Sequence, residues 1–321
     1  MENTQDTTDK ETDMKNIVCA DLHFTGKVPL MRKQTREEWV ELQLMYLRQV
    51  LAEAEKRNAG VIIAGDIFDT PMVDMDLLNK VTEALLAAKE KGIQVYAIAG
   101  NHDLPYHSYE NRLKSCYGNL EKNCLRSNSK DLVLFQFGTE RPSDSHNEVV
   151  VLHHFSVRNA SDLHFGMSGY TAEEIAGMYP ETDFVVIGDN HTPWSVSLVG
   201  GPHIINCGCL IQEKPSDLGH GAGYWIIETD KDPEYVDLSS LGSETIDLGY
   251  LQNNISKKEK EKSLSEVVKV LGEMKYNKGK REVQKYDFLD MLNSYIQENP
   301  LEEGVREFLE ELSEEVKKLL E

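Results

Sequence analysis

Five short apolar runs along the chain each end in acidic, amide or imidazole side chains. With the polar residues that follow them, the runs span residues 17–23, 61–69, 95–103, 149–154 and 184–191. Such runs, rich in Val, Ile and Ala, are typical of strands buried on both faces of a parallel or mixed sheet. Open α/β sheets bind their ligands at the carboxyl ends of the strands. The pattern therefore predicts a sheet whose strand ends share one polar site.

The segments between the first three runs have helical spacing. Residues 35–38 form a capping box, and the apolar positions from 39 to 54 follow the helical period. Basic residues and Gly60 are expected to end this helix. A second helix is expected to begin at Asp74 or Asp76. Alternating strands and helices predict a layered α/β fold.

The polar segment from Tyr106 to Asn123 leaves directly from the third strand end and carries several aromatic and basic residues. It is interpreted either as a surface loop with a short helix or as part of the wall of a substrate site. The sequence leaves both interpretations open.

Composition predicts three regions. Residues 1–14 have almost nothing to bury and are expected to be a disordered tail. Residues 15–245 are expected to form one α/β domain, and residues 246–321 a helical C-terminal region. The Lys-rich stretch 257–281 favours a solvated helix face over nucleic-acid contact. Two amphipathic helices are expected within 288–319. Their apolar faces must pack against each other, against the α/β domain or against a partner protein.

Charge and cysteine content restrict the possible partners and location. The net charge of −21 argues against a general electrostatic attraction to nucleic acid, so a DNA substrate would need metals, local basic residues or a partner. The five cysteines have no repeated spacing, which argues against a disulfide framework and for a reducing compartment. No signal peptide or membrane-length apolar run is visible. We therefore expect a cytoplasmic protein without a membrane partner.

The polar residues at the strand ends suit a dinuclear metal site. Imidazole, carboxylate and amide donors without a thiolate favour borderline and hard ions. Mn is the expected metal, with Fe, Mg or Zn as alternatives. A carboxylate such as Asp66 can bridge two ions roughly 3.5–4 Å apart, which is the spacing that clamps phosphoryl oxygens during displacement.

The order Asp-x-His, Gly-Asp-x-x-Asp, Gly-Asn-His-Asp, His and Gly-x-x-His resembles that of the calcineurin-like metallophosphoesterases, over about residues 16–230. The resemblance implies a sandwich of mixed β-sheets flanked by helices, which hydrolyses phosphoesters by attack of a metal-bridging water. It implies that one ion is held by Asp21, His23, Asp66 and His191. It implies that the other is held by Asp66, Asn101, His153 and Asp189.

The resemblance also assigns two catalytic residues and leaves two positions unusual. His102 is expected to face the scissile phosphate, with Asp103 orienting its imidazole. Asp189 stands where the family usually has a histidine, and its carboxylate favours Mn or Mg over Zn. His153 is preferred to His154 as the ligand because it is the first histidine after the strand.

The spacing of the first three motifs resembles that of SbcD-type DNA repair nucleases, and the Gly-Asp-Asn-His motif at 188–191 resembles that of phage-type members. The loop after the first motif carries the basic residues Lys27, Arg32 and Lys33. A groove wide enough for duplex DNA with these residues on its rim would favour a nuclease over a phosphatase. The C-terminal helices stand where that family binds a coiled-coil, SMC-like ATPase (SbcC-type), and a homodimer is the alternative. The expected function is therefore a DNA nuclease. The alternatives are a phosphatase or phosphodiesterase for a small molecule or phosphoprotein, and a non-catalytic scaffold with the same fold.

Overall fold

The computed structural model describes residues 14–126, 129–139, 148–162 and 169–251, together with Gln297, Arg306 and Glu310. The chain divides into two compact units, Met1–Ile246 and Asp247–Glu321, and the strands and helices named below all belong to the first. Residues 1–13 of the predicted tail 1–14, and almost all of the predicted helical region 246–321, lie outside the described residues, so both stay predictions. Met14, the last residue of that tail, is described, and its N–H donates to Oγ1 of Thr229.

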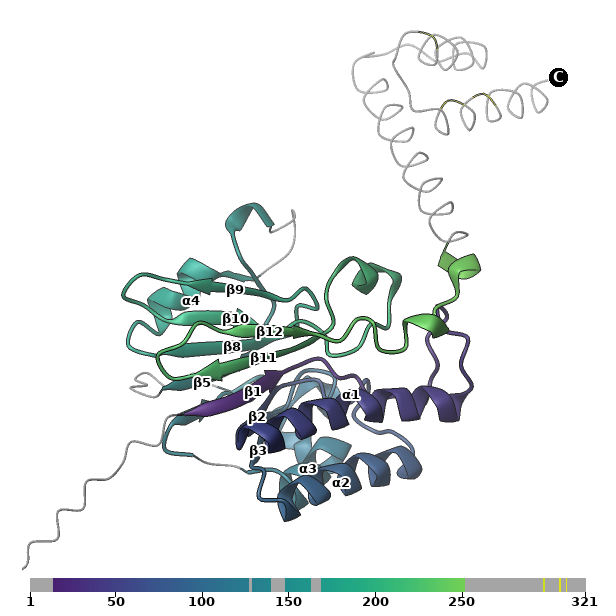
Figure 1. Ribbon diagram of the computed structural model, residues 1–321, viewed down its shortest axis with the longest axis horizontal. Coiled ribbons are helices and arrows are strands. Elements are labelled where there is room, and N and C mark those ends of the chain that lie inside the picture. The colour runs from purple at the N-terminus through teal and green to yellow at the C-terminus, as the bar shows by residue number, and fades with distance from the viewer. Residues whose placement is uncertain are drawn as a thin grey trace, which may run out of the picture. The chain divides into compact units, whose positions relative to one another are not determined.

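The first sheet has the strand order β12-β11-β1-β2-β3 (Figure 1). Strands β1, β2 and β3 run parallel, whereas β11 and β12 are antiparallel to their neighbours. The strands are β1 (Lys15–Cys19), β2 (Gly60–Ala64), β3 (Val95–Ile98), β11 (Gly223–Glu228) and β12 (Glu234–Asp237). The carboxyl ends of β1, β2 and β3, which carry the first three motifs, therefore lie at one edge of this sheet.

The second sheet has the order β4-β5-β8-β10-β9, in which only β9 is antiparallel to its neighbour. Its strands are β4 (Leu132–Leu134), β5 (Val149–His153), β8 (Phe184–Gly188), β9 (Trp194–Ser197) and β10 (His203–Asn206). A short parallel pair, β6 (Ser156–Val157) and β7 (Tyr170–Thr171), lies beyond β5 in the sequence. The last two motifs end β5 and β8, which are adjacent strands.

Helices cover the outer faces of the two sheets. Helices α1 and α2 pack beside the first sheet, and α4 packs against the second. The helices are α1 (Arg36–Arg57), α2 (Met75–Glu90), α3 (Cys116–Asn123) and α4 (Ala172–Met178), with 3₁₀ turns at Pro105–His107, Tyr109–Lys114, Ala160–Asp162, Pro215–Gly219 and Ser243–Thr245. The predicted sandwich of mixed sheets flanked by helices is confirmed.

The start of α1 is as predicted, but its end is not. The side chain of Thr35 accepts the Glu38 N–H and Glu38 bonds back to the Thr35 N–H, which is the expected capping box. The helix ends at Asn58, which has a left-handed φ of 51° and so takes the conformation usually left to glycine. Gly60 instead begins β2. The prediction that Gly60 ends this helix is therefore wrong.

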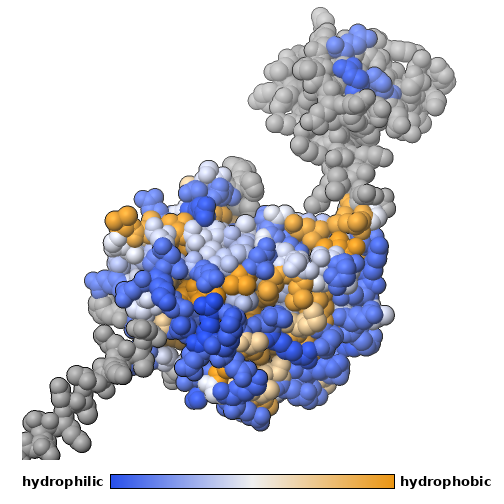
Figure 2. All heavy atoms as spheres, in the orientation of Figure 1, coloured by the Kyte–Doolittle hydropathy of each residue, from blue (hydrophilic) through white to orange (hydrophobic). Residues whose placement is uncertain are grey.

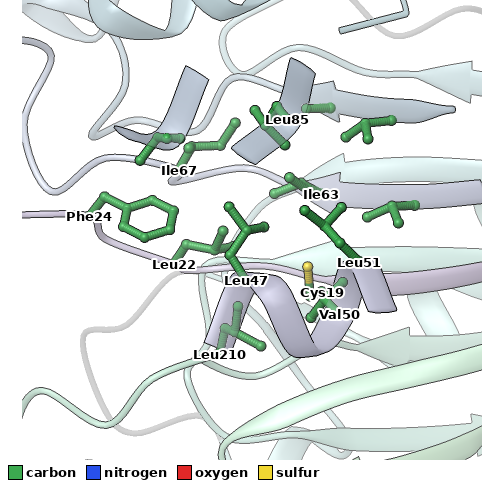
Figure 3. Packing of buried hydrophobic residues seen from close by; sticks show 14 of the residues in the cluster. Cys19, Leu22, Phe24, Leu47, Val50, Leu51, Ile63, Ile67, Leu85 and Leu210 are labelled. Atoms are coloured by element: carbon green, nitrogen blue, oxygen red, sulfur yellow. The ribbon is translucent and has the colours of Figure 1, made fainter. Parts of the chain in front are cut away.

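Three apolar layers hold the sandwich together. One lies under α1 and α2 and includes Leu22, Phe24, Leu47 and Ile63 (Figure 3). A second fills the space between the sheets, where residues such as Val18 of β1 share a cluster with residues of β5 and β8. The third lies under α4. Because the middle layer fixes the sheets face to face, the strand ends that carry the motifs are held at a fixed separation.

The surface of this unit is mainly polar. Figure 2 shows hydrophilic residues over much of the visible face, with apolar residues gathered in patches between them. Among the described residues, no helix is both long and apolar enough to cross a membrane.

Candidate metal centre

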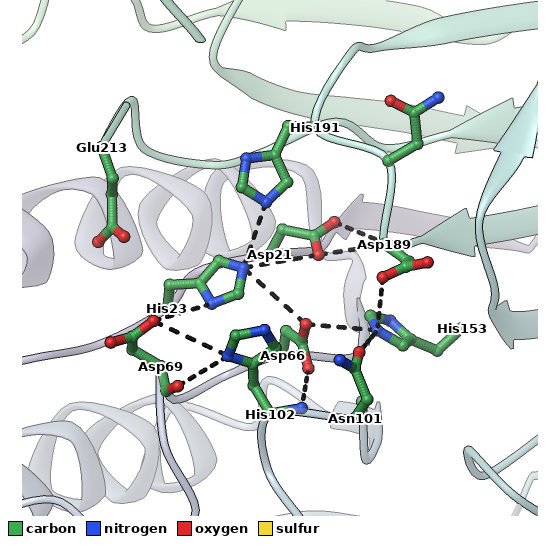
Figure 4. A network of polar contacts seen from close by, with 12 residues as sticks. Asp21, His23, Asp66, Asp69, Asn101, His102, His153, Asp189, His191 and Glu213 are labelled. Atoms are coloured by element: carbon green, nitrogen blue, oxygen red, sulfur yellow. Dashed lines mark hydrogen bonds and ion pairs between the residues drawn. The ribbon is translucent and has the colours of Figure 1, made fainter. Parts of the chain in front are cut away.

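The polar residues at the ends of β1, β2, β3, β5 and β8 converge where the carboxyl ends of the two sheets meet (Figure 4). Backbone bonds join the ends of β1 and β2, because the N–H groups of Leu22 and His23 both donate to the carbonyl of Asp66. The N–H of Asp189, after β8, donates to both carboxylate oxygens of Asp21. Neighbouring strands therefore position one another's donor side chains.

The first predicted ligand set comes together around the ring of His23. Its Nε2 lies 3.3 Å from Nε2 of His191 and 3.9 Å from carboxylate oxygens of both Asp21 and Asp66. Asp21, His23 and Asp66 are buried, and His191 is partly exposed. The four side chains thus present their donor atoms to one small volume.

The second predicted set comes together around His153. Its Nε2 lies 3.0 Å from the amide oxygen of Asn101, 3.4 Å from Asp66 and 3.8 Å from Asp189. Its Nδ1 lies 2.8 Å from the carbonyl of Ala64, a contact that turns Nε2 toward the other donors. Asp66 belongs to both sets, so its carboxylate stands where a bridging ligand is expected.

The donor geometry fits bound metal ions. The Nε2 atoms of His23 and His191 are 3.3 Å apart, close enough for both to bind one ion. Burial lowers the pKa of His23, which keeps its ring in the neutral form that binds metal.

The electrostatics of the second set also favour a cation. Burial lowers the pKa of His153, but the negative charges of Asp66, Asp21 and Asp189 more than offset this and raise it. The surrounding carboxylates therefore attract positive charge, which a divalent ion would also supply.

Backbone strain is concentrated at the donors. Asp21, His23, Asp66 and Asp189 all have positive φ values, between 46° and 92°. This backbone conformation is uncommon for residues other than glycine. Strain of this kind gathers at functional sites, where the surrounding structure enforces it.

Two glycines make room for the donor side chains. A Cβ at Gly65 would lie 2.2 Å from Nδ1 of His153, and a Cβ at Gly100 would lie 2.1 Å from the carboxylate of Asp66. The glycines of the second and third motifs are therefore required by close approach as well as by turning of the chain.

The structure places His102 and Asp103 on different sides of the loop. The carboxylate of Asp103 is fully buried and accepts backbone N–H groups from Ile67, Phe68 and Gly100. The prediction that Asp103 orients the His102 imidazole is therefore wrong. Asp69 takes that position: Nδ1 of His102 lies 2.7 Å from its carbonyl oxygen and 3.8 Å from its carboxylate.

His153, rather than His154, faces the two donor sets. The ring of His154 is exposed, with Nδ1 2.9 Å from the carbonyl of Phe155, and it packs against Tyr170 at 4.6 Å between ring centroids. Neighbouring strand residues point to opposite faces of a sheet, which explains why only one of the two histidines faces inward.

Two acidic residues near the centre were missed by sequence reasoning. Oδ1 of Asp217 lies 3.3 Å from Nδ1 of His191. Glu213 also faces the donors (Figure 4), and its Oε1 is buried without a hydrogen-bond partner among the described residues. Both residues are in the loop that follows β10, where no motif marks them.

The predicted basic rim is only partly present. The guanidinium of Arg32 is buried: Nη1 donates to the carbonyl of Gly242 and Nη2 to the carbonyl of Gln212. It also lies over the Trp39 ring, 5.6 Å from the centroid. Arg32 therefore does not supply the basic rim that would favour a nuclease, because its guanidinium holds loops together inside the protein.

Comparison with known proteins identifies the family. The model of the calcineurin-like phosphoesterases matches residues 14–193, so the chain belongs to this family. Its members are hydrolases that act on phosphoesters and bind two divalent metals, and the convergent His and Asp clusters of this chain are candidate ligands.

The individual proteins that resemble this chain share low sequence identity with it or match only a short segment. The DNA double-strand break repair protein Mre11 of Methanococcus maripaludis is 34% identical over 97 residues. That match covers 30% of this chain and 24% of the relative. A dimetal phosphatase from Danio rerio aligns with 70% of this chain and 99% of its own, at 12% identity and a TM-score of 0.37. TT1561 of Thermus thermophilus aligns with 70% of this chain and 99% of its own, at 10% identity and a TM-score of 0.41.

Proposed function

We propose that the protein is a Mn-dependent DNA nuclease that hydrolyses phosphodiester bonds. The observation that carries the proposal is the pair of donor sets that share Asp66, with His102 beside them. The similarity of a 97-residue segment to a protein named for DNA double-strand break repair supports DNA as the substrate class.

In this proposal, Asp21, His23, Asp66 and His191 hold one ion, and Asp66, Asn101, His153 and Asp189 hold the other. When bound, two divalent ions lower the pKa of water to about 7 and neutralise charge on the phosphoryl oxygens. The carboxylate of Asp189, where an imidazole is usual, adds an oxygen donor and so favours Mn over Zn.

His102 is proposed to donate a proton to the leaving oxygen. Its Nδ1–H donates to the carbonyl of Asp69, 2.7 Å away, so Nε2 is the nitrogen left for substrate. The His102 side chain is 41% exposed and can reach a bound phosphoester. With a proton on Nε2, the ring can act as a general acid toward the leaving oxygen.

A second candidate is a phosphatase or phosphodiesterase for a small molecule or phosphoprotein. The net charge of −21 and the burial of Arg32 favour it, because both weaken electrostatic attraction to a polyanion. A scaffold without catalysis is disfavoured, since all seven donors converge.

The proposed partner of the nuclease is a coiled-coil ATPase, or a second copy of the chain, bound through the C-terminal helices. Those helices lie almost entirely outside the described residues, so this part of the proposal rests on the sequence pattern alone.

The test uses the full chain treated with EDTA and then supplied with Mn²⁺, Mg²⁺ or Zn²⁺. Labelled single- and double-stranded DNA and bis-(p-nitrophenyl) phosphate are offered in parallel. The His102→Ala variant should lose about 10²–10⁴ in rate, the usual contribution of a general acid. His203→Ala is the matched control, because His203 lies at the amino end of β10 and bonds Ser197 instead.

Cleavage of DNA that requires Mn²⁺ and His102 would support the nuclease. Cleavage of the small diester with DNA left intact would overturn it in favour of the second candidate. Binding of metal without cleavage of either substrate would point to the scaffold.

A further inference from the structure

Backbone outliers in the described part of the chain draw attention to one exposed pair. Six of the non-glycine residues with positive φ have an evident role: Asp21, His23, Asp66 and Asp189 in the metal centre, Asn58 at the end of α1, and Asp230 in the turn between β11 and β12. The remaining two are the consecutive residues Tyr106 and His107, with φ of 57° and 52°.

A left-handed backbone is unfavourable for a bulky aromatic residue. The Tyr106 side chain recovers little by packing, because the residue is 90% exposed. Among the residues that the structure describes, none stacks on the Tyr106 ring or forms a hydrogen bond with its hydroxyl. No packing of the Tyr106 side chain against the described residues offsets this strain.

The strained pair is tied to the loop that carries the metal centre. Nδ1 of His107 lies 2.9 Å from the carbonyl of Asn101, and the His107 N–H donates to the carbonyl of Leu104. Five peptide units join Asn101 to Tyr106, so their Cα atoms are at most about 18 Å apart. The bases of a stacked strand are spaced about 3.4 Å apart, so the ring lies within a few nucleotides of the centre.

We propose that Tyr106 is a base-stacking residue that holds a nucleobase of a single-stranded DNA segment beside the metal centre. This inference rests on the proposed nuclease function and adds single-stranded ends to it as the preferred substrate. Aromatic side chains bind bases of any sequence, because every base has a π-face. The two residues that follow Tyr106 in the chain, His107 and Ser108, are polar, and His107 is exposed.

The test combines a protein variant with a substrate variant. Wild-type protein, Tyr106→Ala and Tyr106→Trp are each given a single-stranded oligonucleotide with Mn²⁺. They are also given oligonucleotides with one abasic residue placed at successive positions from the end. Val199→Ala is the control, since Val199 is also fully exposed and lies in the turn between β9 and β10.

Stacking predicts that Tyr106→Ala raises KM for the intact oligonucleotide about 5- to 100-fold, whereas Tyr106→Trp stays near wild type. One abasic position should raise KM in wild type and change nothing further in Tyr106→Ala, because the two changes remove one contact. A merely structural role for Tyr106 would not give this non-additivity.

Equal effects of Tyr106→Ala on intact and abasic substrates at every position would overturn the inference and leave the nuclease intact. An altered oligomeric state with unchanged KM would also overturn it, in favour of a protein contact. If wild-type protein cleaves bis-(p-nitrophenyl) phosphate but neither cleaves nor binds DNA, the proposed function itself has failed, and stacking on DNA fails with it.

Discussion

The imidazole of His191 is held by the carboxylate of Asp217, 26 residues further along the chain, with Nδ1 and Oδ1 3.3 Å apart. The other oxygen of Asp217 accepts the N–H groups of Glu213 and Lys214. The carboxylate is thus fixed by its own loop and fixes the ring in turn. Carboxylates in this position orient metal-binding histidines and raise their basicity.

Replacing Asp217 with alanine should therefore weaken Mn²⁺ binding about 10- to 100-fold, the usual effect of losing such a partner. Isothermal titration calorimetry on the EDTA-treated protein measures this directly. Asp232→Ala, at an exposed position in the turn between β11 and β12, is the control. Unchanged affinity in a folded Asp217→Ala protein would remove His191 from the proposed ligand set.

Asp103 and Asp69 should separate stability from activity. Asp103→Ala leaves three buried N–H groups unpaired and should cost about 2–4 kcal/mol of unfolding free energy, measured by urea denaturation. Asp69→Ala keeps the backbone carbonyl that holds the His102 ring but removes a partly exposed carboxylate 3.8 Å from Nδ1 of both His102 and His23. It should cost under about 1 kcal/mol of unfolding free energy but should lower the rate of phosphodiester cleavage through the lost carboxylate. The reverse pattern would contradict a structural role for Asp103 and a positioning role for Asp69.

Gly65→Ala should disturb the metal centre through His153. The added Cβ would lie 2.2 Å from Nδ1 of that ring, at a backbone φ of 96°. We expect a loss of about 1–3 kcal/mol from overpacking, accompanied by weaker Mn²⁺ binding. Gly92→Ala is a close control, because its φ is 84° but its Cβ would meet nothing within 4 Å. If both variants bind Mn²⁺ like wild type, close approach at Gly65 is unimportant.

Glu213 should make the stability of the EDTA-treated protein depend on pH. Burial, followed by repulsion from Asp69, raises its pKa from 4.5 to about 8. Folding therefore favours the protonated form, and the stability that this carboxyl contributes is complete below pH 4.5 and lost as the pH rises through about 8.

Glu213→Gln stays neutral throughout and should gain about 1–3 kcal/mol over wild type at pH 8.5 but little at pH 5. Thermal unfolding across this pH range tests the sign. A difference that is constant with pH would mean that Glu213 does not titrate in the folded protein.

Removal of metal should lower the melting temperature. A ligand that binds only the folded state at 100 times its Kd contributes about 2.7 kcal/mol, which corresponds to a rise of about 5–10 °C for a domain of this size. Differential scanning calorimetry with EDTA and then excess Mn²⁺ measures the shift. Asp66→Asn, which weakens the shared ligand, should abolish most of it; an equal shift in this variant would indicate metal binding elsewhere.

The sequence predicted those features of the site that depend on short-range order. Each donor lies at the carboxyl end of a strand or within a few residues of it, so recognising the strand also located Asp21, Asp66 and His153. The direction of a side chain after a sharp turn depends on backbone angles that the sequence does not state. For this reason the motif indicates Asp103 as the partner of His102, whereas the folded chain brings Asp69 to that ring.

Long-range contacts were less predictable. Arg32 is held inside the protein by the carbonyl groups of Gln212 and Gly242, about 180 and 210 residues away in the chain. The sequence around Arg32 does not indicate these contacts. Asp217 is likewise defined by the loop that brings it to His191. The roles of such residues can be recognised only when the positions of the loops are known.

The division of donors between the two sheets has a mechanical consequence. Asp21, His23, Asp66 and Asn101 follow strands of the first sheet, whereas His153, Asp189 and His191 follow strands of the second. Neither half of the sandwich carries a complete set, so each bound ion would cross-link the halves much as a disulfide joins distant segments. Metal bound at these sites would then couple the unfolding of one sheet to that of the other. The concentration of metal would determine how far the two halves can separate.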